Sequence, residues 1–184
     1  LVIREAVELG VSKIVVFSFD YCSAYMSENK LERLNKICIE ASKQCGRSRA
    51  IPVEYVVDFK SALEKISDYN EKIFACEFEN GKREKLTVSS DSVAVIIGSE
   101  GGFSDKEFNA LDAAGAIPVS LGNTILRAEV AAIIAIEKIK KWKQELQNLE
   151  LKEKRFLNKK VIDGKLKEKV YEKIPENLEE TLNN

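Results

Sequence analysis

The sequence predicts an α/β fold in which a mostly parallel sheet is covered by helices on both faces. Short apolar runs alternate along the chain with amphipathic helical patterns, the order expected of such folds. The run Ser92–Ile97 is almost wholly apolar, as in a central parallel strand that is buried on both faces. With 184 residues and 45% apolar residues, the chain can form one ordinary domain with an appendage.

The segments follow one another in a regular order. Helical patterns cover residues 2–9, 30–45, 59–67 and 104–114, and a long one begins at residue 128. Glycines at 10, 46 and 115 end three of these helices, and Ser104 with Glu107 predicts a capping box. Strand patterns cover residues 13–17, 52–57, 72–76, 92–97 and 117–120, and Asn80-Gly81 predicts a turn. We expect a domain over residues 1–143 and a charged helical C-terminal extension over residues 144–184.

The composition excludes several classes of function. There are 29 basic and 30 acidic side chains, so a strongly basic nucleic-acid binder is excluded and any such contact needs a local patch. The chain has no histidine, which removes Ser-His and Cys-His catalysis and histidine zinc sites. None of the four cysteines forms a C-x-x-C pair, so we expect reduced thiols and no metal. No apolar run approaches the roughly 20 residues of a membrane span, so we expect a cytoplasmic protein without a membrane contact.

The first candidate functional loop is Gly98-Ser99-Glu100-Gly101-Gly102-Phe103, which follows the apolar strand and precedes the capped helix. It matches neither the phosphate-binding P-loop nor the dinucleotide-binding fingerprint. Its glycines would let a ligand approach the backbone at the carboxyl end of a parallel strand, where open α/β sheets bind ligands. The alternative is a tight turn in which glycine only supplies a positive φ.

The second candidate loop is Leu121-Gly122-Asn123-Thr124-Ile125-Leu126-Arg127, again between a strand and a helix. Because the two loops follow strands that succeed one another in the chain, we expect them to converge. Arg127 is either a surface cap of the helix or a catalytic group. The segment Val130–Ile136 behind it is apolar around its whole circumference, so it should be buried on two sides and contact a partner subunit.

The segment IIGSEGGFSDKEFNALDAAGAIPVSLGNTILRAEVAAIIAI resembles the C-terminal signature of the RsmE family. Two upstream stretches, EAVELGVSKIVVF and EASKQCGRSRAIPV, resemble further motifs of that family, in the same order. The resemblance covers about residues 1–143 and leaves out the family's N-terminal PUA-like RNA-binding domain. Ser99 stands where the family has proline, Ala128 and Val130 replace two threonines, and residues 19–26 lack an expected Glu-Arg-Ser run.

The resemblance implies a SPOUT-class methyltransferase, a homodimer with a trefoil-knotted α/β fold. Such enzymes use S-adenosylmethionine to methylate N3 of one uridine in 16S ribosomal RNA of the small ribosomal subunit, a step in ribosome biogenesis. The two loops would form the knot and hold the cofactor. The residues that would line the cofactor pocket are Gly98, Glu100, Gly101, Leu121, Gly122, Asn123, Ile125 and Leu126.

The chemistry of N3 methylation suggests roles for a few charged side chains. Arg127 stays protonated, so it cannot act as a base, but it can stabilise negative charge on the uracil oxygens. Glu129 is either a base or a helix-capping partner of Arg127, and the second role is favoured. Arg47 and Arg49 are candidates for contacts with RNA phosphates.

Three other functions agree with parts of this pattern. The first is a SPOUT methyltransferase with another RNA target, and the second is a non-catalytic RNA-binding dimer. The third, a generic nucleotide-binding α/β enzyme, fits the order of the motifs poorly. Binding of S-adenosylmethionine separates the enzyme from the non-catalytic dimer.

Overall fold

The computed structural model describes residues 2–22, 26–76 and 88–162, with the backbone alone for residues 156–162. The predicted Asn80-Gly81 turn, and everything expected after residue 162, lies outside these residues. The chain divides into two compact units, one of Leu1–Arg83 with Ser90–Ile139 and the other of Glu84–Ser89 with Lys140–Asn184. The first unit contains every strand in the described part of the chain.

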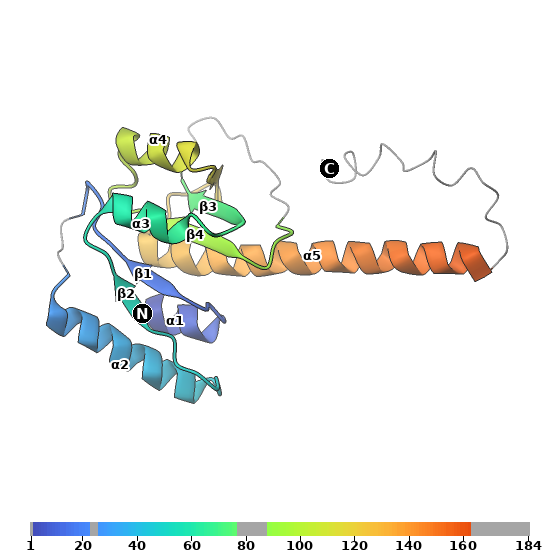
Figure 1. The fold of residues 1–184 in the computed structure, drawn as a ribbon, viewed down its shortest axis with the longest axis horizontal. Coiled ribbons are helices and arrows are strands. Elements are labelled where there is room, and N and C mark those ends of the chain that lie inside the picture. The colour runs from blue at the N-terminus through green and yellow to red at the C-terminus, as the bar shows by residue number, and fades with distance from the viewer. Residues whose placement is uncertain (1, 23–25, 77–87, 163–184) are drawn as a thin grey trace. The chain divides into compact units, whose positions relative to one another are not determined.

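Helices and strands alternate as the sequence predicts (Figure 1). The helices are α1 (Val2–Glu8), α2 (Glu28–Gln44), α3 (Phe59–Ile66), α4 (Asp105–Ala113) and α5 (Ala128–Ile162). The strands are β1 (Ile14–Val16), β2 (Val53–Tyr55), β3 (Glu71–Ala75), β4 (Val93–Ile97) and β5 (Ile117–Val119). Gly10, Gly46 and Gly115 have positive φ angles just after α1, α2 and α4, which confirms their predicted role at helix ends.

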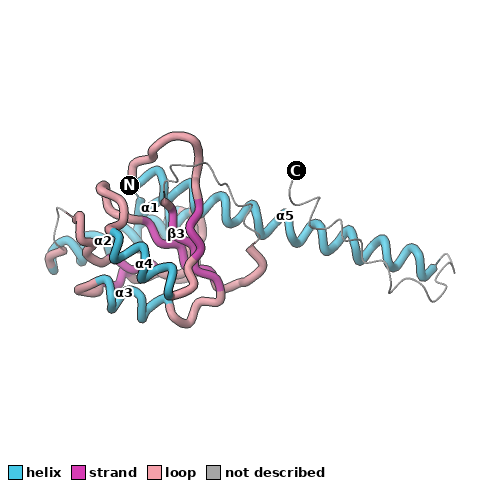
Figure 2. Tube along the Cα trace, turned by 90° about the horizontal axis from the view of Figure 1, so that it is seen from above, coloured by secondary structure: helices cyan, strands magenta, loops and turns pink. Residues whose placement is uncertain are grey.

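The strands in the described residues pair in parallel, in agreement with the predicted mostly parallel sheet, but they form two sheets rather than one. β1 pairs with β2 in a two-stranded sheet, and the other sheet has the order β4-β3-β5. Helices lie around the strands of the first unit (Figure 2). Both strands of the first sheet have only three residues, so its ladder is short.

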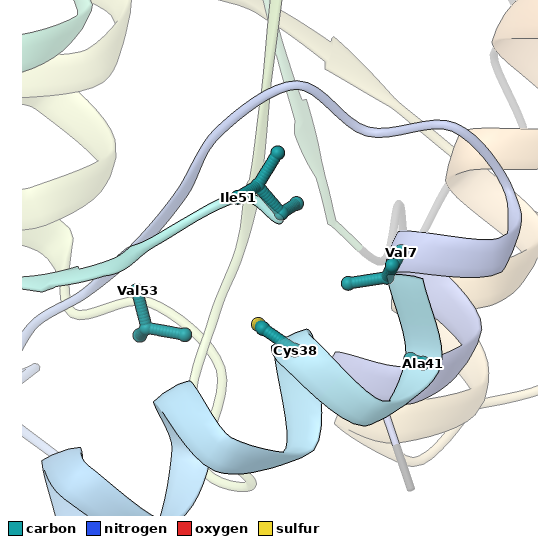
Figure 3. Close-up of a cluster of buried hydrophobic side chains, with 5 residues drawn as sticks. All are labelled: Val7, Cys38, Ala41, Ile51 and Val53. Atoms are coloured by element: carbon teal, nitrogen blue, oxygen red, sulfur yellow. The ribbon is translucent and has the colours of Figure 1, made fainter. Parts of the chain in front are cut away.

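The first sheet is held by a compact apolar cluster with α1 and α2. Val7, Cys38, Ala41, Ile51 and Val53 form its centre (Figure 3). Burial raises the pKa of the Cys38 thiol, which keeps it protonated and inert. Cys38 therefore packs in this cluster as a small apolar side chain.

The second sheet is covered on one face by α3 and α4. Phe74, a fully buried residue near the end of β3, packs with Ala94, Ile96 and Leu111. Phe17 and Phe19, at the end of β1, pack against the same cluster, so the two sheets share one unit. Ile73, the neighbour of Phe74 in β3, is also buried and points to the opposite face of the sheet.

Helix α5 continues into the expected C-terminal extension and reaches Ile162, the last residue that the structure describes. Residues from 140 onward are rich in strong helix formers, and Lys141 and Glu145 form an i,i+4 ion pair of 3.8 Å. No helix in the described ranges is long and apolar enough to cross a membrane.

Candidate active site

The second sheet places the two candidate loops at one edge. Ala75 is the register partner of both Ile97 and Val119, so β3, β4 and β5 end level with one another. The loops after β4 and β5 therefore begin on either side of the end of β3. Two strand spacings separate their origins by about 10 Å. The two loops therefore share one edge of the sheet, with the end of β3 between them.

The loop after β4 is a tight turn. The Gly102 N–H donates to the Ser99 carbonyl at 3.0 Å, and the Ser99 hydroxyl donates to the Gly102 carbonyl at 3.1 Å. Gly102 has a φ of +76°, so the interpretation of glycine as a conformational requirement holds at this position. Glu100 and Gly101 lie exposed at the tip of the turn.

The other two glycines of this loop are needed for space. A Cβ atom on Gly98 would lie 3.2 Å from the Gly102 carbonyl carbon and from the Phe103 ring. A Cβ atom on Gly101 would lie 2.8 Å from the Cβ of Tyr21, which comes from the connection between β1 and α2. The contact between Tyr21 and Gly101 has no signal in the sequence, because the two residues belong to separate segments of the chain.

Helix α4 begins with the predicted capping box, and this box extends to a third residue. The Ser104 N–H donates to Glu107 Oε2 at 2.8 Å, and the Glu107 N–H donates to Ser104 Oγ at 3.3 Å. The Asp20 N–H donates to Glu107 Oε1 at 2.8 Å, and the Ser104 hydroxyl donates to Asp20 Oδ2 at 2.7 Å. Glu107 is only 2% exposed. We call Asp20, Ser104 and Glu107 the α4 clamp; it fixes the connection after β1 beside the first candidate loop.

The loop after β5 is open. The Ser120 hydroxyl donates to the Gly122 carbonyl at 2.9 Å, and a Cβ atom on Gly122 would meet nothing within 4 Å. Asn123 is exposed, and Ile125 is 79% exposed. Leu121 and Leu126 are half-buried. The loop therefore presents backbone and apolar surface that nothing in the described part of the unit covers.

Arg127 stands at the start of α5. Its carbonyl accepts the first helical hydrogen bond from the Ala131 N–H at 2.8 Å, and its side chain is exposed. A cation at a helix N-terminus opposes the helix dipole, so this guanidinium does not stabilise α5. Among the described residues no ion pair joins Arg127 to Glu129, so the predicted capping partnership has no contact that supports it.

The two arginines that follow α2 have different surroundings. The Nη1 atom of Arg47 donates to the carbonyls of Val7 and Val11, both at 2.9 Å, and so ties down the end of α1. Arg49 is exposed. The structure thus gives Arg47 a role within the fold that its sequence position does not reveal, since its partners lie 36 and 40 residues away.

No group of three or more cysteine and carboxylate side chains in the described ranges could hold a metal ion. The site is instead defined by two loops at the level ends of parallel strands. The arrangement offers backbone groups, apolar side chains and one exposed guanidinium. These are the features of an α/β enzyme that binds a small organic molecule at its strand ends.

The fold and the site define an α/β protein that binds a ligand at the ends of parallel strands. Comparison of its sequence with known families shows which family it belongs to. The model of the RNA methyltransferase domain family matches residues 1–140, and the chain belongs to this family. Its relatives include proteins named ribosomal RNA small subunit methyltransferase E, so the resemblance to the RsmE family is confirmed.

Two of these relatives show the extent of the match. The protein of Mesomycoplasma hyopneumoniae is 32% identical over 140 residues, which are 74% of this chain and 61% of the relative. The protein of Rickettsia conorii is 34% identical over 145 residues, which are 76% of this chain and 58% of the relative. The chain thus spans about three fifths of the length of these curated relatives.

Solved structures share the fold. A Legionella pneumophila protein in complex with SAM matches with a TM-score of 0.68 and 29% identity, over 76% of this chain and 59% of the other. Ribosomal RNA small subunit methyltransferase E of Neisseria gonorrhoeae, bound to S-adenosyl methionine, matches with a TM-score of 0.64 and 28% identity, over 76% and 59%. The predicted SPOUT-type α/β class is thereby confirmed.

The contacts of Arg47 predict that this arginine stabilises the fold and that Arg49 does not. Replacing Arg47 by alanine removes two charge-assisted hydrogen bonds, so the free energy of unfolding should fall by about 2 kcal/mol. Arg49→Ala, a matched change at an exposed position, should stay within about 0.5 kcal/mol of the parent. Urea denaturation followed by circular dichroism measures both values. Equal stability of the two variants would contradict the role given to Arg47.

Proposed function

We propose that this domain transfers a methyl group from S-adenosylmethionine to N3 of a uridine in 16S ribosomal RNA. The observation that carries the proposal is the pair of glycine-bearing loops at the level ends of β4 (Val93–Ile97) and β5 (Ile117–Val119). Membership of the RNA methyltransferase domain family and the names of the relatives support it. The substrate would be the small ribosomal subunit, and the place of action the cytoplasm.

The two loops fit a cofactor with an adenosine and an amino acid part. On the β5 side, the open space beside Gly122 lets a ligand reach the backbone, and the Leu121, Ile125 and Leu126 side chains supply apolar walls. On the β4 side, backbone groups of Gly98, Glu100 and Gly101 would contact it, and Asn123 would add a polar contact from the second loop. Bound there, the cofactor supplies an electrophilic methyl group. The trefoil knot that the resemblance implies stays a prediction.

Arg127 would assist the chemistry by electrostatics. The N3 atom of uracil carries a proton at neutral pH, and it becomes nucleophilic only as that proton leaves. A guanidinium beside a uracil oxygen stabilises the resulting negative charge and lowers the pKa of N3. Arg127 is suited to this role because its side chain is exposed, unpaired with Glu129, and directly follows the cofactor loop.

A homodimer would cover the apolar surface that α5 leaves open. Ala131, Ala132, Ala135 and Ile139 are buried within the first unit, whereas Val130 is 43% exposed and Ile133 and Ile134 are only half-buried. Val130, Ile133 and Ile134 are three and four residues apart, so they share one side of α5, which begins directly after the cofactor loop. A second copy of the chain is the partner that the family resemblance implies.

Two alternatives keep the same fold. A SPOUT methyltransferase with another RNA target would bind the cofactor equally well but modify a different nucleotide. A non-catalytic RNA-binding dimer would bind RNA without turnover. Mass mapping of the methylated nucleotide distinguishes the proposed target from another RNA target. Single-turnover assays with labelled cofactor distinguish an enzyme from a non-catalytic RNA-binding dimer.

The cofactor site is tested most cleanly at Gly122. Its Cβ position is empty and its φ is not positive, so Gly122→Val should fold like the parent. The new side chain would fill space that the cofactor needs, and the dissociation constant for S-adenosylmethionine should rise at least about tenfold, a loss of roughly 1.4 kcal/mol. Isothermal titration calorimetry measures this change.

The control for this test adds a branched side chain away from the loops. Ala113→Val, on the exposed end of α4, should leave the cofactor affinity unchanged. Gly101 is a poorer test position, because any side chain there would displace Tyr21 whether or not the cofactor binds. Parent-like affinity in Gly122→Val would refute the assignment of this loop.

Arg127→Ala should slow methyl transfer by about 10²–10³-fold and leave the affinity for S-adenosylmethionine within about twofold, because its charge matters most as uracil becomes anionic. The assay is single-turnover labelling of small ribosomal subunits with excess enzyme, which limits the influence of weak RNA binding. Arg49→Ala serves as the control, since it should weaken RNA binding without changing the rate at saturation. An undiminished rate in Arg127→Ala would remove this residue from the mechanism.

The dimer is tested by placing a charge on the open side of α5. Val130→Asp should fold, because Val130 is exposed within one chain, but it should convert the dimer into a monomer. Lys106→Glu, an exposed change on α4, should remain dimeric. Sedimentation equilibrium at micromolar concentration reports both states. A parent chain that sediments as a monomer there would contradict the proposed assembly.

A further inference from the structure

We infer that Tyr21 is a stacking platform for a nucleobase of the RNA substrate. This inference rests on the proposed function, because it takes RNA as the substrate, and it adds a residue from outside the two cofactor loops. The observation behind it is the contact of an exposed aromatic ring with the tip of the first candidate loop.

The ring of Tyr21 is supported by the loop and open to solvent. Its Cγ and Cδ2 atoms lie 3.4 and 3.5 Å from the point where a Cβ atom of Gly101 would stand, so the ring occupies the space that glycine leaves free. The residue is nevertheless 56% exposed. A planar aromatic group that is supported by backbone and open elsewhere can receive an unstacked base.

Core packing does not account for this position. Phe17, Phe19, Phe59 and Phe103 make ring-to-ring contacts that link β1, α3 and the first loop. Tyr21 takes part in none of the ring contacts found in the described ranges, and it belongs to neither buried cluster. Its exposed apolar surface therefore contributes little to folding.

The α4 clamp holds Tyr21 in place. The preceding residue, Asp20, is bound through its N–H to Glu107 and through its carboxylate to Ser104. Because the backbone beside Tyr21 is fixed before RNA arrives, little conformational entropy is lost when a base stacks on the ring. Rigid presentation of this kind is what a binding residue needs and what a residue in a free loop lacks.

The local charge favours a base over a phosphate. Asp20 and Glu100 are exposed carboxylates next to Tyr21 and Gly101 in the chain, and they would repel a phosphate group. A nucleobase is uncharged and binds through its π face. The chain around Tyr21 leaves β1, which is not a strand of the β4-β3-β5 sheet, so the ring belongs to neither cofactor loop. These features point to a base of the RNA rather than to the adenine of the cofactor.

The test compares Tyr21→Ala, Tyr21→Leu and Tyr21→Phe in the full chain. The probes are a fluorescent oligouridylate and an abasic oligonucleotide of the same length, and S-adenosylmethionine is titrated in parallel by calorimetry. Stacking contributes about 1–3 kcal/mol per base, so Tyr21→Ala should weaken oligouridylate binding by roughly 5- to 150-fold. Tyr21→Leu should be nearly as weak, and Tyr21→Phe should stay within about twofold of the parent. Val57→Ala, which also removes exposed apolar surface, is the control.

Each other outcome has a defined meaning. Oligouridylate binding that is unchanged in Tyr21→Ala overturns the inference, as does an equal loss of binding to the abasic probe. A loss of cofactor affinity in Tyr21→Ala assigns the ring to the cofactor or to the loop structure and also overturns it. Failure of the parent to bind S-adenosylmethionine would instead overturn the proposed function, while the base-dependent loss at Tyr21 would still be measured.

Discussion

The candidate site depends on the hydrogen bonds of one buried carboxylate, that of Glu107. A charged group at 2% exposure needs a partner for each oxygen, because an unpaired buried acceptor costs a large desolvation penalty. The capping box satisfies Oε2 at the start of α4, whereas Oε1 accepts from the Asp20 N–H, its one partner among the described residues, which lies 87 residues away. The connection after β1 is therefore drawn to the start of α4, and with it Tyr21 is drawn to the loop after β4.

This interaction also explains how two short sheets act as one unit. The strands of the first sheet do not extend the ladder of the second, so hydrogen bonds between strands do not join them in the described residues. The chain that leaves β1 joins them instead: Phe17 and Phe19 enter the cluster around Phe74, and Asp20 binds α4. The site thus lies where one sheet ends and the chain from the other arrives.

Local signals made most of the fold predictable from the sequence. The glycines after α1, α2 and α4 and the Ser104–Glu107 capping box act within a few residues, so their positions in the structure match the prediction. Both candidate loops were also predictable, since each follows an apolar strand. The insertion of β3 between β4 and β5, the bonds of Arg47 to α1, and the contact of Tyr21 with Gly101 were not predictable. Each depends on residues far apart in the chain, for which one sequence carries no signal.

The near-neutral charge of the chain constrains how the proposed enzyme would bind RNA. Proteins that rely on phosphate contacts gain affinity by releasing counterions, and a net charge of −1, with Arg47 engaged inside the fold, offers little of that gain. Exposed apolar and aromatic groups at the site, such as Tyr21 and Ile125, contribute affinity only when a base or a ligand fits closely against them. On the proposed function, such a surface would bind most RNA weakly and would bind best where the target base is already unstacked. On the proposed function, the structure of the ribosomal RNA around its target then supplies much of the specificity.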